Sequence, residues 1–153
     1  MRGTGIDDVN KAPDYCRQSQ VGTVREIGTV ERRLTMYQFT NEFMSHDENV
    51  EFLRTNMMGP NAMRLSEELA SYLDINENMR ILDLGCGSGL STLFLVKKYG
   101  AQVFAADLWI SPTENYERFR TLGIDDKAIP IFVDATKGLP FAHGYFDLML
   151  SID

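Results

Sequence analysis

The sequence has 153 residues, a length that fits one domain of ordinary size. Its hydrophobic content of 44% and its charged content of 24% are typical of a globular protein. The formal net charge of −7 argues against nonspecific nucleic-acid binding, which depends on clustered lysine and arginine. Apolar runs are far shorter than the roughly 20 residues that span a bilayer, and the polar N-terminal residues lack the apolar core of a signal peptide. We therefore expect a cytoplasmic protein with no membrane span and no nucleic-acid partner.

The two cysteines, Cys16 and Cys86, lie far apart and show no metal-binding spacing. Cys86 stands among glycines, where a disulfide would obstruct any ligand that the glycines admit. We expect both thiols to be reduced, as is usual in the cytoplasm, and we expect no metal site.

Residues 1–43 are hard to interpret, because their scattered charges and glycines follow neither the helix period nor the strand period. One interpretation makes them an N-terminal extension, a fusion or an upstream reading, with the domain itself occupying residues 44–153. The other makes them a cap over the binding site. The sequence leaves both open.

The first helix that the sequence predicts begins after Gly59-Pro60 and ends near Asp74, with Asn61 as its N-cap. Its apolar stripe consists of Ala62, Leu65, Leu69, Ala70 and Leu73. The preceding pair Met57-Met58 is interpreted as core filling, since methionine adapts to irregular gaps, and a ligand-binding pair is the alternative.

Residues 80–108 organise the rest of the sequence. Two apolar runs, Arg80–Leu84 and Gln102–Asp107, are predicted as parallel strands joined by a helix that ends before Gly100. Glycines at positions 85, 87 and 89 let the backbone approach a ligand closely, and the helix behind them offers free N–H groups and a partial positive charge. An acid at the end of the second strand can accept hydrogen bonds from ribose hydroxyls. This pattern predicts a nucleotide or nucleoside pocket.

The glycine spacing separates two classes of nucleotide site. The dinucleotide fingerprint G-x-G-x-x-G needs glycine or alanine at position 90, where the sequence has Leu90. The pattern D-x-G-x-G-x-G is formed instead by Asp83, Gly85, Gly87 and Gly89. Here the chain resembles the class I S-adenosylmethionine-dependent methyltransferases, whose first motif reads E/D-x-G-x-G-x-G. The run ADLWISPTENYERFR also looks like a bacterial group of small-molecule-type methyltransferases, and the resemblance covers roughly residues 48–153.

Three more elements are predicted downstream. Ser111 and Glu114 form a capping box for a helix that runs from Pro112 to about Leu122. Residues 129–133 and 145–153 are predicted as the third and fourth strands, and the segment between them is similar to the family's usual link. The predicted fold is α/β, a Rossmann-like doubly wound parallel sheet truncated after strand 4, with strand order 3-2-1-4.

The resemblance implies a set of cofactor-binding residues at the carboxyl ends of the strands. They are Asp83, Gly85, Cys86, Gly87, Gly89, Asp107, Leu108, Trp109, Asp134, Ala135 and Ser151. The implied cofactor is S-adenosyl-L-methionine. No catalytic residue is assigned, and His143 is interpreted as a solvated loop residue.

Each acid in this set has a role implied by the resemblance and a structural alternative. Asp83 would contact the amino group of the methionine moiety, or cap the loop. Asp107 would bind the ribose hydroxyls, or be an ordinary strand-end acid. Asp134 would accept from the adenine amine while Ala135 donates its N–H to the ring, or Asp134 would cap the following turn. Trp109 would cover adenine, or pack on the surface.

The implied activity is methyl transfer from S-adenosylmethionine to a small-molecule or lipid-like acceptor. The sulfonium makes the methyl carbon electrophilic, so the protein mainly aligns a nucleophile with it. The alternative is a module or partial domain that binds the cofactor without turnover. A nicotinamide-dependent oxidoreductase is disfavoured by Leu90.

The resembled fold has a seven-stranded sheet in the order 3-2-1-4-5-7-6, and the sequence contains only the first four strands. We therefore expect this chain alone to be an incomplete methyltransferase with negligible turnover. Its fourth strand carries neither lysine nor proline, the residues that usually protect a natural edge. Self-association through that strand or poor solubility is expected. The alternative is that these residues are part of a longer protein that supplies the next strand.

Overall fold

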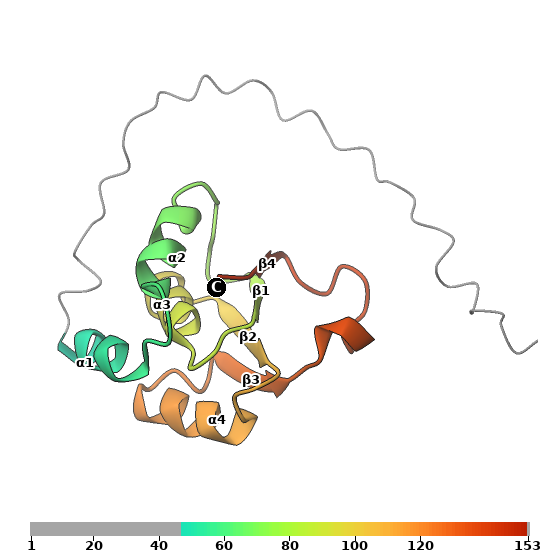
Figure 1. Cartoon of the computed structure of the whole chain (residues 1–153). Coiled ribbons are helices and arrows are strands. Elements are labelled where there is room, and N and C mark those ends of the chain that lie inside the picture. Colours follow the sequence, from blue (N-terminus) through green and yellow to red (C-terminus); the bar gives the residue numbers. More distant parts are fainter. Residues whose placement is uncertain (1–46, 153) are drawn as a thin grey trace, which may run out of the picture. The chain divides into compact units, whose positions relative to one another are not determined.

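A computed structural model of the protein describes residues 47–152, all within the unit Met36–Asp153. The interpretations of residues 1–43 and of Cys16, and the last predicted strand residue, lie outside the described residues. The described elements follow in chain order (Figure 1): α1 (Asp47–Asn56), α2 (Ala62–Ala70), β1 (Arg80–Leu84), α3 (Leu90–Tyr99), β2 (Gln102–Asp107), α4 (Pro112–Thr121), β3 (Ala128–Phe132), the 3-10 turn η3 (Ala135–Lys137) and β4 (Leu148–Leu150).

The strands form one parallel sheet in the order β3-β2-β1-β4, which confirms the predicted fold class. The chain passes outward from β1 through β2 to β3 and then returns to β4 on the other side of β1. The order therefore reverses between β1 and β4. In open α/β sheets, ligands bind outside the carboxyl ends of the strands at such a reversal.

The helices pack on one face of the sheet. Ile81 and Val103 point to this face and meet Leu93 of α3 and Phe119 of α4 in one buried cluster. The clean alternation of side chains along β1 and β2 separates this cluster from the opposite face. Among the described helices, none combines the length and the apolar character that a bilayer crossing requires.

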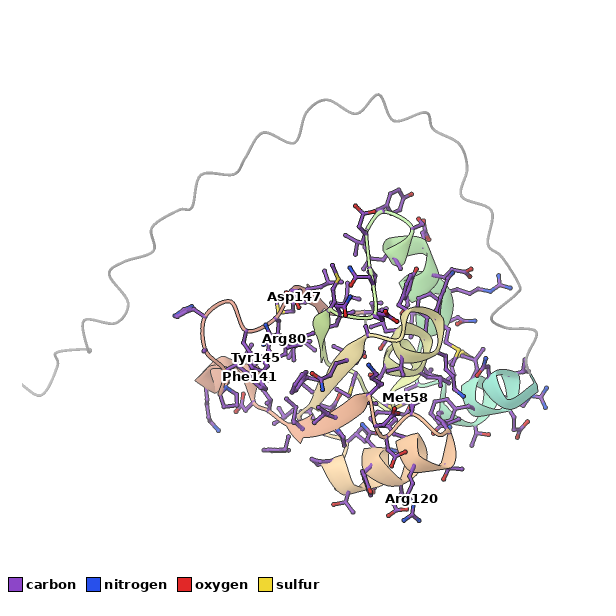
Figure 2. All side chains as sticks on the ribbon, turned by 180° about the vertical axis from the view of Figure 1, so that it is seen from behind. Met58, Arg80, Arg120, Phe141, Tyr145 and Asp147 are labelled. Atoms are coloured by element: carbon purple, nitrogen blue, oxygen red, sulfur yellow. The ribbon has the colours of Figure 1, made fainter. Side chains whose placement is uncertain are left out.

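The opposite face is covered by the segment between β3 and β4 rather than by a helix. Phe104 of β2 meets Phe141, Tyr145 and Phe146 edge-on, with ring centroids 5.7, 5.6 and 5.3 Å apart. The guanidinium of Arg80 lies 4.6 Å from the centroid of Tyr145, and Figure 2 shows Arg80, Tyr145 and Phe141 close together. Edge-to-face rings and a stacked cation add to the stability that simple burial gives.

The same cluster explains why β4 is shorter than predicted. Tyr145 and Phe146 turn into the aromatic cluster, so they do not continue the strand. Asp147 accepts from the N–H of Arg80 at 2.8 Å and returns its own N–H to the Arg80 carbonyl at 2.9 Å. Pairing with β1 begins only after this brace, at Leu148.

The predicted apolar stripe of α2 was wrong in most of its members, although Ala70 is buried. Leu65 and Leu69 remain 38% and 39% exposed. The buried residues are Met63, Ser66, Glu67 and Ala70. Their spacing is also helical, and the polar members are satisfied: Ser66 Oγ donates to a carbonyl of its own helix at 2.7 Å, and Glu67 lies 3.7 Å from the Lys98 ammonium. Counting only apolar residues selected the wrong face.

The other helix ends agree more closely with prediction, although α2 ends at Ala70 rather than near Asp74. Asn61 caps α2, its side chain accepting from the N–H of Arg64 at 3.1 Å. Gly100 ends α3 in the left-handed conformation. Ser111 caps α4, although its hydroxyl accepts from Thr113, and Glu114 is 3.8 Å from Arg118 instead.

Candidate functional site

The glycine loop, residues 85–89, joins β1 to α3 at the carboxyl edge of the sheet. Gly85, Gly87 and Gly89 have φ values of 75°, 53° and 89°. Residues with a Cβ rarely adopt this region, so the backbone path itself requires glycine. The N–H groups of Gly85 and Cys86 both donate to the Ala106 carbonyl, at 2.8 and 3.1 Å, and hold the loop against the end of β2.

The glycines have different surroundings. A Cβ on Gly89 would lie 2.4 Å from a ring carbon of Phe119, so α4 packs directly beneath this end of the loop. A Cβ on Gly85 would meet nothing within 4 Å. Gly89 is therefore required by packing, whereas Gly85 leaves an open side where a ligand can approach.

Asp107 fastens the loop to the segment after β2. One carboxylate oxygen accepts from the N–H of Gly87 at 2.9 Å, and the other accepts from the N–H groups of Trp109 and Ile110 at 2.6 and 2.9 Å. The side chain is buried. A carboxylate offers about four acceptor positions, and these bonds use three of them.

Asp83 lies inside the molecule, 1% exposed, between β1 and α3. Its Oδ2 accepts from the hydroxyls of Ser91 and Thr92, both at 2.6 Å. Its Oδ1 has no hydrogen-bond partner. Burial raises the pKa of this carboxyl, the two hydroxyls oppose that rise, and the nearby charge of Asp107 adds to it.

Cys86 is buried in the same loop, and burial together with the charges of Asp83 and Asp107 raises the pKa of its thiol. The thiol therefore stays protonated near neutral pH and is a poor nucleophile. This agrees with a non-catalytic role for Cys86 in the glycine loop.

Asn115 of α4 is a loop contact that the sequence analysis missed. Its Nδ2 donates to the Gly87 carbonyl at 2.8 Å, and the residue is buried. The available signal was helical spacing, because Asn115 lies one turn before Phe119 on the face that α4 buries. An amide at such a position needs a polar partner.

A cavity of about 310 Å³ opens against the glycine loop. It is lined by residues 85–88, Leu90 and Ser91 of the loop and of α3, by Met58, Pro60 and Ala62 from the segment around the start of α2, and by Ile152. The interpretation of Met57-Met58 as core filling was wrong, because their side chains are 50% and 70% exposed. Met58 instead lines the cavity, its sulfur 3.8 Å from the position a Cβ on Gly87 would take.

The other predicted site residues lie apart from this cavity wall. Trp109 is 87% exposed and Leu108 lies exposed beside it. Ser151 lines a separate groove with Leu65 and Tyr72. Ile152, the next residue, is the one that reaches the cavity.

Asp134 adopts the capping arrangement that was its structural alternative. It accepts from the N–H and the hydroxyl of Thr136, at 3.1 and 2.6 Å, and lies 2.9 Å from the Lys137 ammonium. These partners lower the pKa of its carboxyl, the Thr136 hydroxyl most of all. Ala135 is exposed at the start of η3, and His143 is exposed on its loop.

Within residues 47–152, no three His, Cys, Asp or Glu side chains are grouped closely enough to hold a metal ion. Two buried carboxyl groups lie at the loop: Asp83, with one oxygen that has no partner, and Asp107, which is bonded to the loop backbone.

Comparison with known proteins defines the class of this site. Residues 81–153 match the family model of a methyltransferase domain. The structure of a geranyl diphosphate methyltransferase in complex with S-adenosylmethionine shares the fold with a TM-score of 0.53, at 24% identity over 58% of this chain and 36% of that one. Residues 81–153 thus match a methyltransferase domain, and the described sheet and helices have the class I, Rossmann-like methyltransferase fold over part of that domain, as the first motif predicted.

Two curated proteins show which methyltransferases it resembles. It is 33% identical over 91 residues to methyltransferase GfsG of Streptomyces halstedii, across 59% of this chain and 32% of that protein. It is 31% identical over 87 residues to sterol 4-C-methyltransferase strm-1 of Caenorhabditis elegans, across 55% of this chain and 25% of that protein. The chain spans a third or less of the length of these relatives.

Proposed function

We propose that residues 44–153 form the cofactor-binding part of an S-adenosylmethionine-dependent methyltransferase for a small-molecule or lipid-like acceptor, with residues 1–43 as an extension. The observation that carries this is the glycine loop at the reversal of strand order, placed directly beside a half-satisfied buried carboxylate. When bound, the cofactor supplies an electrophilic methyl carbon. The chain itself binds, orients and shields the reactants.

Asp83 is the proposed partner of the cofactor's amino group. A buried acceptor without a partner costs about 1–3 kcal/mol, and a ligand ammonium would remove that cost. Ser91, which donates to the other oxygen of Asp83, lines the cavity, so the carboxylate stands just behind its wall. A cation placed there would also favour the ionised carboxylate and lower its raised pKa.

The remaining acceptor position of Asp107 is proposed to bind a ribose hydroxyl. Leu108 and Trp109, exposed beside it, are proposed to cover the adenine ring. The proposal for Asp134 and Ala135 is that the capped turn presents its backbone to the adenine edge. On the cavity wall, Ile152 takes the place proposed for Ser151.

The acceptor is proposed to be largely apolar. Met58, Pro60, Ala62 and Leu90 supply apolar surface to the cavity beside the loop. Among the similar proteins, one is named for a sterol, one as a probable enzyme for tocopherol, and one for geranyl diphosphate, which joins an apolar chain to a charged head. No residue among 47–152 is assigned as a general base.

The test is ligand-dependent melting of the full chain. S-adenosylhomocysteine at about 100 times its dissociation constant should stabilise the protein by about 2.7 kcal/mol, and NAD should not. Stabilisation by NAD alone would contradict the proposal. Binding of S-adenosylhomocysteine without methyl transfer to any apolar acceptor would favour the alternative, a binding module without turnover.

Self-association through β4 is a further proposal. Of the described strands, β4 pairs only with β1, and its Met149 is exposed. Sedimentation should show association that Met149→Lys weakens. The matched control is Phe132→Lys on β3, the opposite edge strand, where Phe132 is also exposed. If Met149→Lys and the wild type both sediment as the same associated species, the proposed contact through β4 is contradicted.

A further inference from the structure

We propose that Asn115 is a positioning residue that sets cofactor affinity by fixing the conformation of Gly87, an inference that rests on the proposed function. Gly87 is held at both of its backbone polar groups. Its N–H donates to Asp107 at 2.9 Å, and its carbonyl accepts from Asn115 Nδ2 at 2.8 Å. These two bonds orient the peptide planes on either side of the Gly87 Cα, and so fix its φ and ψ.

The amide of Asn115 has only one orientation that satisfies its neighbours. Arg118 Nη1 donates to Asn115 Oδ1 at 2.8 Å. A guanidinium can only donate and a carbonyl can only accept, so the amide oxygen must face Arg118 and the NH₂ group must face the loop. The second N–H of that group is directed at Cys86 Sγ, 3.7 Å from the nitrogen. Both polar atoms of this buried amide therefore have partners.

Arg118 is the residue that orients Asn115. Its bond to the amide is charge-assisted, which makes it stronger than a neutral one. Arg118 also lies 3.8 Å from Glu114, but both side chains are partly exposed, so that ion pair contributes little. Arg118 therefore orients Asn115, its neighbour on α4, and Asn115 in turn fixes the conformation of Gly87 in the loop.

The consequence for a ligand follows from the flexibility of glycine. A loop with three glycines has large conformational freedom, and a ligand that orders such a loop loses affinity. Asn115 and Asp107 order it beforehand. Gly87 and Cys86 line the cavity while Asn115 does not, so Asn115 acts on the ligand through these loop residues, and its shorter bond is to Gly87.

The decisive variant is Asn115→Asp. A carboxylate retains the size of the side chain and its partner Arg118, but it has no N–H to donate to Gly87. In the full chain, calorimetry should show S-adenosylhomocysteine binding about tenfold more weakly. Hydrogen exchange without ligand should quicken at residues 85–89 and stay unchanged in β1, which a general loss of stability would not produce.

Arg118→Ala and Arg120→Ala form a matched pair on α4. Arg118→Ala frees the Asn115 amide to rotate and should weaken binding about threefold. Arg120 pairs with Glu117 at 3.1 Å, is 62% exposed and lies on the outer side of α4 (Figure 2), so Arg120→Ala should leave affinity unchanged.

Unchanged affinity in Asn115→Asp would overturn the proposal, as would faster exchange spread evenly over the sheet. If Asn115→Asp fails to fold, the affinity of Arg118→Ala tests the proposal instead, because that variant keeps the Asn115 side chain and removes only the group that orients it. If wild type binds neither S-adenosylmethionine nor S-adenosylhomocysteine, the proposed function fails. The exchange of residues 85–89 then still shows whether Asn115 fixes the loop.

Discussion

The carboxylate of Asp107 accepts a hydrogen bond from the N–H of Gly87, a residue twenty positions earlier, at 2.9 Å. The same carboxylate holds the N–H groups of Trp109 and Ile110. An acid that the sequence suggested as a ribose ligand thus also joins the glycine loop to the segment after β2. Its removal should affect the free protein as well as the complex.

Asp107→Ala should weaken binding of S-adenosylhomocysteine by about ten- to a hundredfold, because bonds to a charged acceptor contribute about 1.5–3 kcal/mol. It should also lower the free energy of unfolding, since three backbone N–H groups lose their acceptor. Calorimetry and urea unfolding measure the two effects. A variant with wild-type stability would show that the loop bonds contribute nothing.

A ligand analogue separates the ribose role of Asp107 from its role in the loop. S-adenosylhomocysteine without its ribose hydroxyls should bind wild type more weakly, and this penalty should be smaller in Asp107→Ala. An equal penalty in both proteins would leave Asp107 with the loop role alone.

Gly89→Ala should be strongly destabilising. Its Cβ would lie 2.4 Å from Phe119, and its φ is +89°. Overpacking costs about 1–3 kcal/mol, and the left-handed backbone adds about 1–2 kcal/mol. Gly123→Ala is the control, because Gly123 has a φ of +63° but open space around it, so only the backbone cost applies. Equal unfolding free energies for the two variants would contradict the packing role of Phe119.

The elements around the loop could be predicted because their signals are local. Arg80–Leu84 and Gln102–Asp107 were predicted with the bounds that the structure shows, since both are short apolar runs limited by glycine or acid. β4 was predicted too long because the residue at which it begins depends on the hydrogen bond between Asp147 and Arg80, two residues 67 positions apart. Apolar content along the chain carries no sign of such a brace.

The glycine loop of the site could be predicted from the sequence, whereas the side chains that hold the loop in place were harder to predict. The glycines at 85, 87 and 89 can be recognised from their spacing in the sequence, and all three have a positive φ in the structure. Asn115 cannot be recognised in this way, because nothing in the sequence of a polar helix shows that one of its asparagines contacts Gly87. Met58 was assigned to the core because side-chain type alone does not show that the segment before α2 faces a cavity.

Ser88→Ala should loosen α1 locally. The Ser88 hydroxyl donates at 2.8 Å to the carbonyl of Asn56, the last residue of α1. Its loss should cost about 0.5–1.5 kcal/mol and quicken hydrogen exchange in α1 while β1 stays protected. Thr55→Ala is the control, because the Thr55 hydroxyl bonds only within α1, to exposed Glu51 at 3.4 Å. Uniform exchange changes across the sheet would refute a local tie.

Asp83 should make the free energy of unfolding depend on pH. Burial raises its pKa in the folded protein above the ordinary value of 3.8, so the folded state binds more protons than the unfolded state just above pH 3.8. Its favourable contribution is therefore complete below that pH and is lost as pH rises through the folded pKa. Asp83→Asn cannot titrate, and its amide can still accept from Ser91 and Thr92.

The stability of Asp83→Asn relative to wild type should consequently increase as pH rises from about 4 towards neutrality, measured by urea unfolding without ligand. Asp134→Asn is the control of opposite sign. The Thr136 hydroxyl and Lys137 lower the pKa of Asp134, so its stabilising contribution is present above pH 3.8 and is lost only as pH falls below it. Relative to wild type, Asp134→Asn should thus stay level over the range in which Asp83→Asn changes. A level profile for Asp83→Asn as well would mean that Asp83 is ionised in the folded protein at every pH tested, despite its buried and unpaired oxygen.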